Sequence, residues 1–351
     1  MTDTAANKVL DWYGQNARDL PWRNPPGRAL PTERDWPYRV WLSEIMLQQT
    51  TVAAVRGYFA AFTARWPTVA ALAAAADADV MQAWAGLCYY ARARNLLACA
   101  RAITADHVGH FPSDEAVLRT LPGIGDYTAA AIAALAFGRH AIVIDGNVER
   151  IVTRLFAIDT PLPAARGEIR AALAAITPAA AGDFAQGLMD LASRICTPRQ
   201  PRCLLCPLQP DCRAAASGSP ARWPVKLAKR PRPTRLGTTW WIESGGDVLT
   251  IVRPARGLLG GMRALPSNDW RDAAGAAAPP FPGAWHDLGA VTHGFTHFEL
   301  VLRVQAIRMP TKPALAGQWL NVNDVDGAGL PVLFTKAAML ARANFTITET
   351  A

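Results

Sequence analysis

Apolar side chains in the first 212 residues recur at the three- and four-residue spacing of amphipathic helices. Proline, glycine and aspartate interrupt the repeats and mark where helices begin and end. The pattern predicts helices over residues 37–49, 51–66, 77–87, 89–109, 114–121, 127–138, 147–158, 165–176 and 183–196. A proline-rich loop, residues 24–36, lies between an earlier helix and the helix over 37–49. This part of the chain is therefore expected to be entirely helical.

The hydrophobic period changes to two after residue 236. Residues 237–244 and 247–254 read as strands that flank a Gly-Gly turn, and residues 297–307 alternate apolar with polar side chains. That alternation is typical of strands with one buried face. A last helix is expected over residues 333–344. The fold class predicted is multi-domain: an all-α domain over residues 1–212, then an α+β domain over residues 236–351.

Composition places the chain among globular proteins, since 51% of its 351 residues are hydrophobic. The N-terminus lacks the basic stretch and apolar run of a secretory signal. Nothing approaches the run of about 18 apolar residues that a membrane span needs. We expect a soluble cytoplasmic protein with no membrane partner.

The formal net charge of +8 is concentrated in one segment. Residues 213–235 hold seven basic side chains and no acidic one, whereas the flanking regions are close to neutral. Such a run is more often a solvated linker than a specific binding site. An extended basic strap could also lie along a phosphate backbone and make salt-sensitive contacts. The charge therefore permits nucleic-acid binding without requiring it.

Four of the six cysteines fall within 17 residues, with gaps of six, two and five residues: Cys196, Cys203, Cys206 and Cys212. A disulfide scaffold is not expected in a protein without an export signal. Four thiolates at this density bind zinc or an iron–sulfur cluster, and their spacing leaves both open. Cys88 and Cys99 are isolated and are expected to be small buried hydrophobic residues.

Several segments together resemble one family. The cysteine loop over 196–212 closes a helical domain that also contains LPGIGDYTA, in a hairpin over 118–132, and VIDGNVER. That combination resembles the helix–hairpin–helix base-excision DNA glycosylases with a [4Fe–4S] cluster. SEIMLQQT (43–50), GLCYYARARN (86–95) and the second domain narrow the resemblance to the MutY adenine glycosylases. It implies removal of adenine mispaired with 8-oxoguanine, and it favours an iron–sulfur cluster over zinc.

The hairpin is the first expected DNA contact. Gly123 and Gly125 leave backbone N–H groups uncovered near a helix N-terminus, which suits a DNA phosphate. In the family a monovalent cation often binds there. Relatives that also cut the DNA strand carry a lysine where Tyr127 stands, and its amine attacks the sugar C1′. Tyrosine cannot do so, and Tyr127 is expected to hydrogen-bond the catalytic aspartate instead.

Two carboxylates are expected to perform the chemistry. Glu44 shares its helix face with apolar side chains, so its pKa should rise toward neutrality and suit it to protonate the leaving adenine. Asp145 follows an apolar run and opens a helix, where aspartate is a good N-cap. The resemblance places Asp145 beneath C1′, where it stabilises positive charge, with Asn147 orienting it.

The resemblance also implies how adenine leaves the duplex and is held. Gln49 and Tyr89 would wedge the base stack with Leu47 beside them. The adenine pocket would be lined by Arg18, Leu20, Trp22 and Gln186. One departure bears on Tyr89, because Cys88 stands where relatives have glycine.

The second domain resembles the Nudix fold found at the end of this family. Its sequence lacks the glycine- and glutamate-rich metal box, so phosphate-bond hydrolysis is not expected. Phe295, Thr296 and His297 match a segment that meets 8-oxoguanine, with threonine in place of serine. An edge strand with outward polar residues is the alternative for this segment.

These observations lead to one hypothesis and two rivals. We expect a monomeric, monofunctional adenine DNA glycosylase whose partner is double-stranded DNA with an adenine:8-oxoguanine mispair, acting in the cytoplasm on nucleoid DNA. The first rival is a bifunctional glycosylase–lyase for oxidised pyrimidines, which the absent lysine and the second domain disfavour. The second is a non-catalytic lesion-binding protein, which the presence of both carboxylates disfavours.

Overall fold

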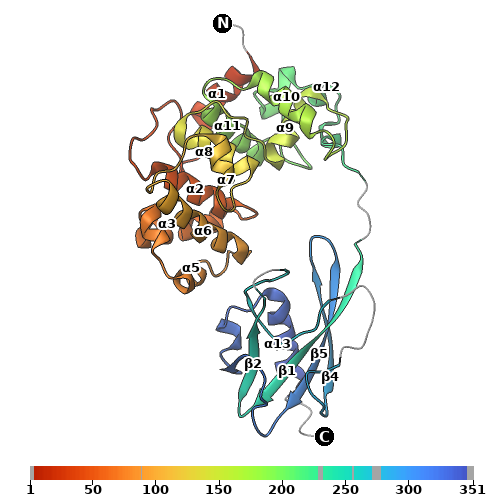
Figure 1. The fold of residues 1–351 in the computed structure, drawn as a ribbon. Coiled ribbons are helices and arrows are strands. Elements are labelled where there is room, and N and C mark those ends of the chain that lie inside the picture. Colours follow the sequence, from red (N-terminus) through yellow and green to blue (C-terminus); the bar gives the residue numbers. More distant parts are fainter. Residues whose placement is uncertain (1–3, 88, 228–231, 255–256, 271–277, 346–351) are drawn as a thin grey trace. The chain divides into compact units, whose positions relative to one another are not determined.

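The computed structural model describes residues 4–87, 89–227, 232–254, 257–270 and 278–345. The chain forms two compact units, Met1–Ala228 and Lys229–Ala351 (Figure 1). The first is helical and the second combines a sheet with a helix, as the hydrophobic periods predict. Within the described residues, no helix is both long and apolar enough to cross a bilayer.

The helical unit contains a helix in each of the nine segments expected from periodicity. Threonine hydroxyls cap the first turns of three helices, at Thr4, Thr51 and Thr68. The first half of the unit comprises α1 (Ala5–Asn16), α2 (Trp36–Leu47), α3 (Val52–Arg65), α4 (Val69–Ala73), α5 (Asp77–Ala83) and α6 (Tyr90–Asp106). α4 was not expected, because five residues are too few to show a helical period.

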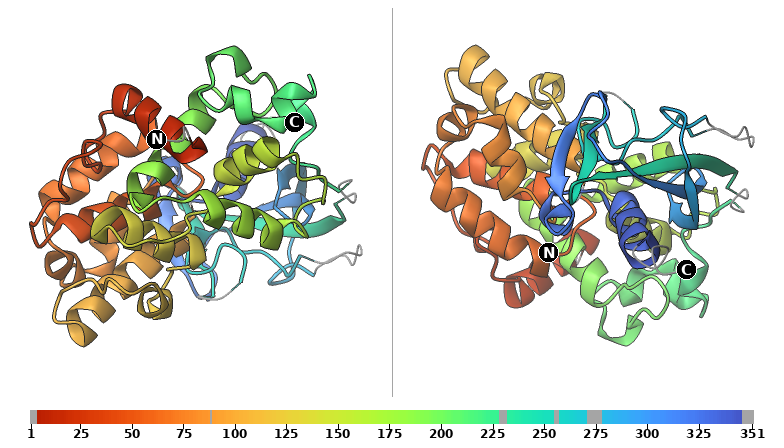
Figure 2. Two further views of the ribbon diagram at one scale, coloured as in Figure 1. Left: turned by 90° about the horizontal axis from the view of Figure 1, so that it is seen from above. Right: turned by 90° about the horizontal axis from the view of Figure 1, so that it is seen from below.

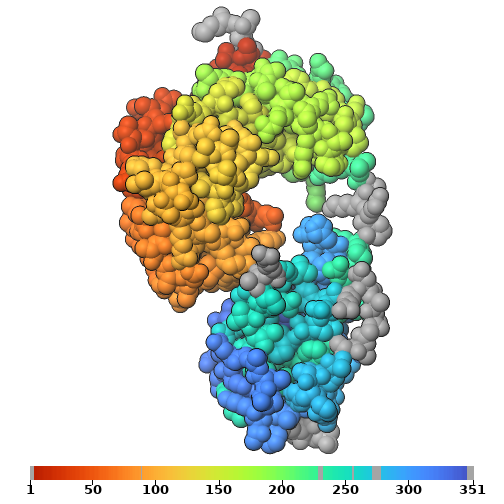
Figure 3. All heavy atoms as spheres, viewed as in Figure 1, coloured from red at the N-terminus to blue at the C-terminus, as the bar shows by residue number. Residues whose placement is uncertain are grey.

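The second half of the unit is built around α8 (Asp126–Phe137), in which every residue from Thr128 to Ala136 is buried. A helix that is apolar on all sides belongs at the centre of a fold. α2 packs directly against it. The remaining helices are α7 (Glu115–Thr120), α9 (Gly146–Phe156), α10 (Arg166–Ile176), α11 (Ala181–Arg194) and α12 (Arg213–Ala216). In Figure 3 the side chains from α3 to α9 form one continuous filled mass.

α1, the first helix of the chain, packs against α11, and the two helices lie close together (Figure 2). A Cβ atom placed on Gly187 of α11 would lie 2.9 Å from Val9 and 3.1 Å from Tyr13 of α1. Only glycine fits without movement at such a crossing. The close approach brings the Tyr13 hydroxyl to the side chain of Gln186, 173 residues further along the chain.

The helical unit extends further than the boundary at residue 212 expected from sequence. Trp223 is buried, and its backbone carbonyl accepts a hydrogen bond of 3.0 Å from Arg154. The backbone N–H of Leu162 donates to Val225 at 2.9 Å. The first part of the expected linker over 213–235 is therefore packed structure. The run of basic residues predicted a linker, whereas the buried Trp223 packs the first part of this segment against the helical unit.

The second unit is a six-stranded mixed sheet with a helix against it. β1 and β5 pair in parallel at its centre, and the strand order is β3-β2-β1-β5-β4, with β6 also paired to β2. α13 (Val332–Phe345) packs on β4 and β5. The strands are β1 (Thr234–Ser244), β2 (Asp247–Val252), β3 (Arg263–Ala264), β4 (His286–Gly294), β5 (Glu299–Arg308) and β6 (Gln318–Asn321).

The expected strands and final helix of this unit are present, and the alternation in β5 has its expected cause. Leu300, Leu302 and Val304 are fully buried and pack with Phe334 of α13. β3, β4 and β6 were not expected from the sequence. β4 holds no fully buried residue, so its sequence has no apolar alternation to detect. β3 and β6 are too short to show one.

Candidate active site

A cleft of about 800 Å³ opens in the helical unit where α2, α8, α11 and the start of α9 converge with the segment after α1. Residues from distant parts of the sequence meet there because α8 is central and α1 folds back onto α11. The cleft is lined by ten of the residues expected to act on the base: Glu44, Tyr127, Asp145, Asn147, Arg18, Leu20, Trp22, Gln186, Leu47 and Gln49.

Glu44 lies on the buried face of α2, and only 7% of its surface is exposed. Its Oε2 atom accepts a hydrogen bond of 2.8 Å from the Tyr127 hydroxyl. Burial raises the pKa of the Glu44 carboxyl because the charged form loses its hydration. The Tyr127 hydrogen bond and the Arg23 cation oppose that rise, while Asp145 adds to it. Burial therefore favours the protonated form of the Glu44 carboxyl.

Tyr127 has a different partner from the one expected. Its hydroxyl donates to Glu44 rather than to Asp145, because α8 packs directly on α2. Burial and the nearby Glu44 raise the pKa of Tyr127 well above its usual value, so the phenol stays protonated and remains a donor. Asp145 is close enough to contribute to that rise. Tyr127 therefore lies near Asp145, as expected, but its hydroxyl hydrogen-bonds Glu44 instead.

Asp145 is the N-cap of α9. Its Oδ1 accepts from the backbone N–H groups of Asn147 at 2.9 Å and Val148 at 2.8 Å. The Asn147 side chain donates to Oδ2 at 2.7 Å. Three donors therefore fix the carboxylate in one orientation at the edge of the cleft. The capping role is realised, and the orienting contact from Asn147 is present.

Arg150 continues this chain of contacts away from the cleft. Its guanidinium donates to the Asn147 side-chain oxygen at 3.2 Å and to the Cys196 carbonyl at 2.8 Å. Asp145 is thus connected through two side chains to the start of the cysteine loop.

Gln186 and Arg18 form the far wall of the cleft together with Leu20 and Trp22, which are buried. The Tyr13 hydroxyl donates to Gln186 Oε1 at 2.7 Å, which turns the amide nitrogen of Gln186 away from Tyr13. Arg18 is held by the carboxylate of Asp190, with 2.7 Å from its Nε to Oδ1. The polar groups of Gln186 and Arg18 are therefore held in fixed orientations in the cleft.

Sequence reasoning missed Arg23, which lines the cleft, and also Tyr13 and Asp190, which bond to the lining residues Gln186 and Arg18. Asp190 is fully buried, and Arg23 donates to it at 2.9 Å. One signal was available. Gln186 and Asp190 are four residues apart on α11, so a polar pair shares a face of a helix that is otherwise largely apolar on that side.

The expected wedge residues lie in unusual backbone conformations. Gln49 has φ 57° and Tyr89 has φ 48°, a left-handed region that non-glycine residues seldom occupy. Strain of this kind is common at functional sites. Gln49 and Leu47 line the cleft, whereas Tyr89 does not and is 59% exposed. Cys88 lies outside the described residues.

The expected hairpin connects α7 to α8. Gly123 has φ +75°, and a Cβ there would lie 2.7 Å from Asn95, so glycine is required on both grounds. Gly125 is the N-cap of α8, with open space beside it and no side-chain cap. The first N–H groups of α8 are thus uncovered by any capping side chain.

The four clustered cysteines lie in a loop that α9 and its arginines hold against the unit. Arg154 is buried, and it donates to the Cys196 sulfur at 3.3 Å and to the Thr197 and Pro198 carbonyls at 2.8 Å. Burial raises the pKa of Cys206 to about 12, and the other three thiols add to the rise, so all four are neighbours. As they stand among the described residues, no three metal-ligating side chains converge tightly enough to hold an ion.

The candidate lesion-reading residues of the second unit occupy the turn between β4 and β5. Phe295 stacks on Phe298 with 4.8 Å between ring centroids, which leaves Thr296 and His297 exposed at the tip. Arg232 donates to the Phe295 carbonyl at 3.1 Å. The edge-strand alternative does not describe Thr296 and His297, since they lie in a turn beyond the strand ends.

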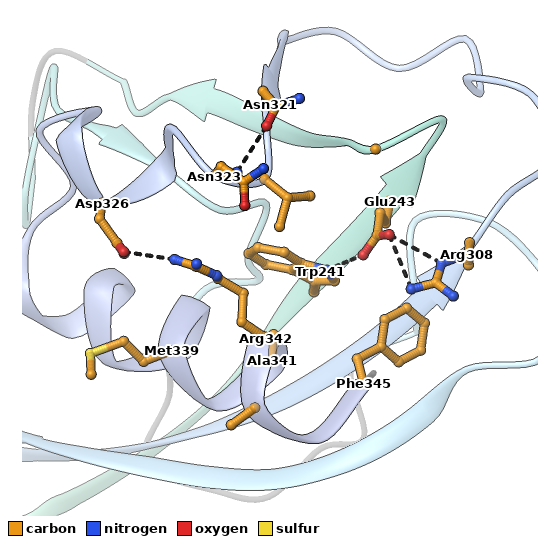
Figure 4. A pocket seen from close by; sticks show the side chains of 13 residues that line it. Trp241, Glu243, Arg308, Asn321, Asn323, Asp326, Met339, Ala341, Arg342 and Phe345 are labelled. Atoms are coloured by element: carbon orange, nitrogen blue, oxygen red, sulfur yellow. Dashed lines mark hydrogen bonds and ion pairs between the residues drawn. The ribbon is translucent and has the colours of Figure 1, made fainter. Parts of the chain in front are cut away.

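The second unit also contains a pocket of about 700 Å³ between β1, α13 and the loop after β6 (Figure 4). The charged side chains that line this pocket form ion pairs with one another. Arg308 pairs with Glu243 at 3.1 Å, and Arg342 pairs with Asp326 at 2.6 Å. The Trp241 indole also donates to Glu243. Because these carboxylates are engaged by cations of the same unit, the pocket does not resemble a cluster of metal ligands.

Comparisons with known proteins agree with the fold and the cleft. Residues 42–178 match the family described as HhH-GPD superfamily base excision DNA repair protein, and residues 238–339 match a NUDIX domain. The class is therefore that of the helix–hairpin–helix base-excision repair proteins, here joined to a Nudix-like unit.

Among solved structures, the chain is similar to a thermostable thymine-DNA glycosylase, with 27% identity and a TM-score of 0.54, over 60% of this chain and 95% of that one. It shares its fold with endonuclease III in a non-covalent DNA complex, with 23% identity and a TM-score of 0.50, over 61% and 94% of the two chains.

Curated relatives carry the name adenine DNA glycosylase. The Homo sapiens protein is 34% identical over 93% of this chain and 72% of its own length. The Mus musculus protein is 32% identical over 94% and 76%, and the Mycolicibacterium smegmatis protein 40% over 64% and 73%. The chain belongs to the adenine DNA glycosylase family, which confirms the resemblance drawn from its motifs.

Proposed function

We propose that this protein is a monofunctional DNA glycosylase that hydrolyses the N-glycosidic bond of adenine mispaired with 8-oxoguanine. One observation carries the proposal: Glu44, whose burial favours its protonated form, and an oriented Asp145 line the same cleft, whose volume of about 800 Å³ is large enough for a purine. A raised-pKa acid and a second carboxylate in a different environment are the pair that glycosidic hydrolysis requires.

The reaction begins when adenine leaves the stack and enters the cleft between Glu44 and the Gln186 wall. Glu44 transfers its proton to N7 as the C1′–N9 bond breaks, and the bonding electrons leave with the base. The sugar becomes oxocarbenium-like, and the Asp145 carboxylate stabilises its positive charge. Water then adds its hydroxyl to C1′, and the proton that it releases restores the acid. The product is an abasic site.

Strand cleavage is not part of the proposed reaction. A lyase needs an amine that attacks C1′. Tyr127 stands where lyases of this class carry lysine, and no lysine is found among the described residues that line the cleft. This observation favours a monofunctional glycosylase over a glycosylase–lyase.

We also propose that the cysteine loop carries a [4Fe–4S] cluster, held by Cys196, Cys203, Cys206 and Cys212. The donor set fits in kind, since four soft thiols share one loop and the buried cation of Arg154 lies beside Cys196, although no three of them converge on one point in the described residues. The cluster would tie the loop to α9 and so present Arg199 and Arg202 to DNA. No step of the base-removal chemistry passes through it.

Recognition of the mispair is assigned to several surfaces. Gly123 and Gly125 would bind a DNA phosphate, with a monovalent cation at the hairpin, while Gln49, Leu47 and Tyr89 wedge the stack. The turn at Phe295, Thr296 and His297 would read 8-oxoguanine in the opposite strand. The proposal includes a monomeric protein that acts on nucleoid DNA in the cytoplasm.

A single-turnover assay with adenine opposite 8-oxoguanine, guanine and thymine tests the proposal. We expect adenine release, fastest opposite 8-oxoguanine, and a strand that breaks only after alkali. Glu44→Gln should retain mispair binding while losing at least about 100-fold in rate. A borohydride-trapped covalent adduct in high yield would establish a lyase instead, and unchanged function of Glu44→Gln would establish a non-catalytic binding protein.

A further inference from the structure

The buried carboxylate of Asp190 has no role in the proposed reaction, although it bonds to two side chains that line the cleft. None of its side-chain surface is exposed. It accepts from the Arg18 backbone N–H at 3.1 Å, from Arg18 Nε at 2.7 Å and from Arg23 Nη1 at 2.9 Å. Burial works to raise the pKa of Asp190, but the two arginines outweigh it and lower the pKa, so the carboxylate is ionised.

Arg23 connects this charge to the acid of the site. It lines the cleft together with Glu44, and its side chain is only 9% exposed. A cation in such a place favours the ionised form of a neighbouring carboxyl and so opposes the effect of burial. Asp190 partly neutralises that cation by direct contact. The proton affinity of Glu44 is therefore influenced by the Arg23–Asp190 ion pair and not by the charge of Arg23 alone.

The other charged and titratable groups around Glu44 are already engaged. From α8 the Tyr127 hydroxyl donates to Glu44, and Asp145 faces it from the start of α9. α3 and α6 also pack against α2, and Arg56 and Arg92 of these helices bond to backbone carbonyls: Arg56 to Asp19, and Arg92 to Ile45, Met46 and Leu87. Arg18 is bound to Asp190.

We propose that Asp190 and Arg23 are positioning residues that set how readily Glu44 holds its proton, with Asp190 offsetting the cation that would otherwise ionise the acid. The inference rests on the proposed function, in which protonated Glu44 is the active form. Asp190 touches neither the base nor the sugar. Its effect passes through Arg23 to the carboxyl group, and through Arg18 to the wall of the cleft.

Opposite substitutions should therefore move the activity in opposite directions. Asp190→Asn leaves Arg23 uncompensated, stabilises ionised Glu44 and shifts the alkaline fall in the rate of base removal to lower pH. Arg23→Met removes the cation and shifts that fall to higher pH. Each shift should be roughly half to one pH unit, because the two charges already partly cancel. Arg23→Lys keeps the charge and should restore the wild-type profile.

The experiment is a single-turnover pH profile of adenine release by the full-length protein at saturating enzyme. Asp77→Asn is a matched control, since it removes a carboxylate paired with Arg101 at 2.7 Å on the surface of the same unit. It should leave the profile unchanged. If Asp190→Asn does not fold, the pair Arg23→Met and Arg23→Lys still decides the matter.

The outcomes separate the inference from the function on which it rests. Opposite shifts, with rescue by lysine, support the charge pair. A purely structural role would lower the rate by the same factor at every pH without moving the alkaline limb, and that result overturns the inference alone. Failure of the wild-type and Asp77→Asn proteins to release adenine at any pH would overturn the proposed function.

Discussion

Glu44 and Asp145 are both carboxylates of one cleft, yet their surroundings differ. Glu44 lies among apolar side chains of α2 and accepts one hydrogen bond, whereas Asp145 accepts three at the start of α9. Burial favours the protonated form of Glu44, whereas three donors fix the orientation of Asp145. The different surroundings of the two carboxylates are what the proposed reaction requires.

The raised pKa of Glu44 predicts a cost in stability. A carboxyl whose folded pKa exceeds its unfolded value contributes stability in full below the unfolded pKa, about 4.3, and loses it as pH rises through the folded pKa. Glutamine does not titrate. We therefore expect Glu44→Gln to gain stability over the wild type across the pH range above about 4.3, by about 1.4 kcal/mol for each unit of pKa shift. Urea unfolding across that range measures it, and a difference independent of pH contradicts it.

At the scale of elements, α9 connects the cleft to the cysteine loop. Its N-cap, Asp145, lies in the cleft, while Arg150 and Arg154 are four residues apart on the face toward the loop. One helix therefore fixes both the orientation of a carboxylate and the path of residues 196–198. This arrangement allows the capping and chemical roles of Asp145 to be separated.

Asp145→Asn should preserve the cap but not the charge, because asparagine caps helices as well as aspartate does. We expect a free energy of unfolding close to that of the wild type, with at least about a 100-fold loss in the rate of base removal. Asp145→Ala should lose the same activity and a further ~1 kcal/mol of stability. Denaturant unfolding and single-turnover rates measure the two effects. Equal stability of the two variants would show that the cap contributes nothing.

Arg154 is expected to hold the cysteine loop and its cluster. Arg154→Met removes hydrogen bonds to the Thr197, Pro198 and Trp223 carbonyls and leaves these acceptors, one of them in the buried residue Trp223, without their donor. A loss of at least about 2 kcal/mol in stability should follow. Iron and sulfide content, with visible absorbance, should fall in parallel. The surface variant Arg101→Met is the control, and full cluster content in Arg154→Met would contradict the assignment.

At the scale of the whole molecule, the two units have separate hydrophobic cores, and the boundary between them along the chain falls between residues 228 and 229. The division matters for experiments, because a cut at residue 212 removes α12 and the buried Trp223 from the helical unit. A core that is complete within one unit should fold without the other.

A fragment of residues 1–228 is expected to fold cooperatively and to remove adenine, with less discrimination between 8-oxoguanine and guanine than the full chain. A fragment of residues 1–212 should melt at a lower temperature, because Arg154 and Leu162 lose backbone partners in the missing segment. Thermal unfolding and single-turnover rates compare the two. Equal melting temperatures would show that residues 213–228 add no stability.

Much of this molecule follows from sequence because the relevant signals are local. Helical periodicity identified nine helices of the first unit, and alternation in β5 identified a strand with one buried face. The cap at Asp145 and the turn at Gly123 are set by neighbouring residues. Segments that lacked a local signal were missed: α4 is one turn long, and β4 has little buried surface.

What the sequence determined by itself was therefore the order of the elements, the family motifs and the chemical groups available. Tertiary structure alone decided which groups meet. Tyr127 donates to Glu44, 83 residues away, and Arg18 binds Asp190 across 172 residues. The physical reason is that a polar side chain buried in a fold takes the partner that packing brings within hydrogen-bond distance. That choice depends on how α1, α2, α8 and α11 pack, which no short stretch of sequence encodes.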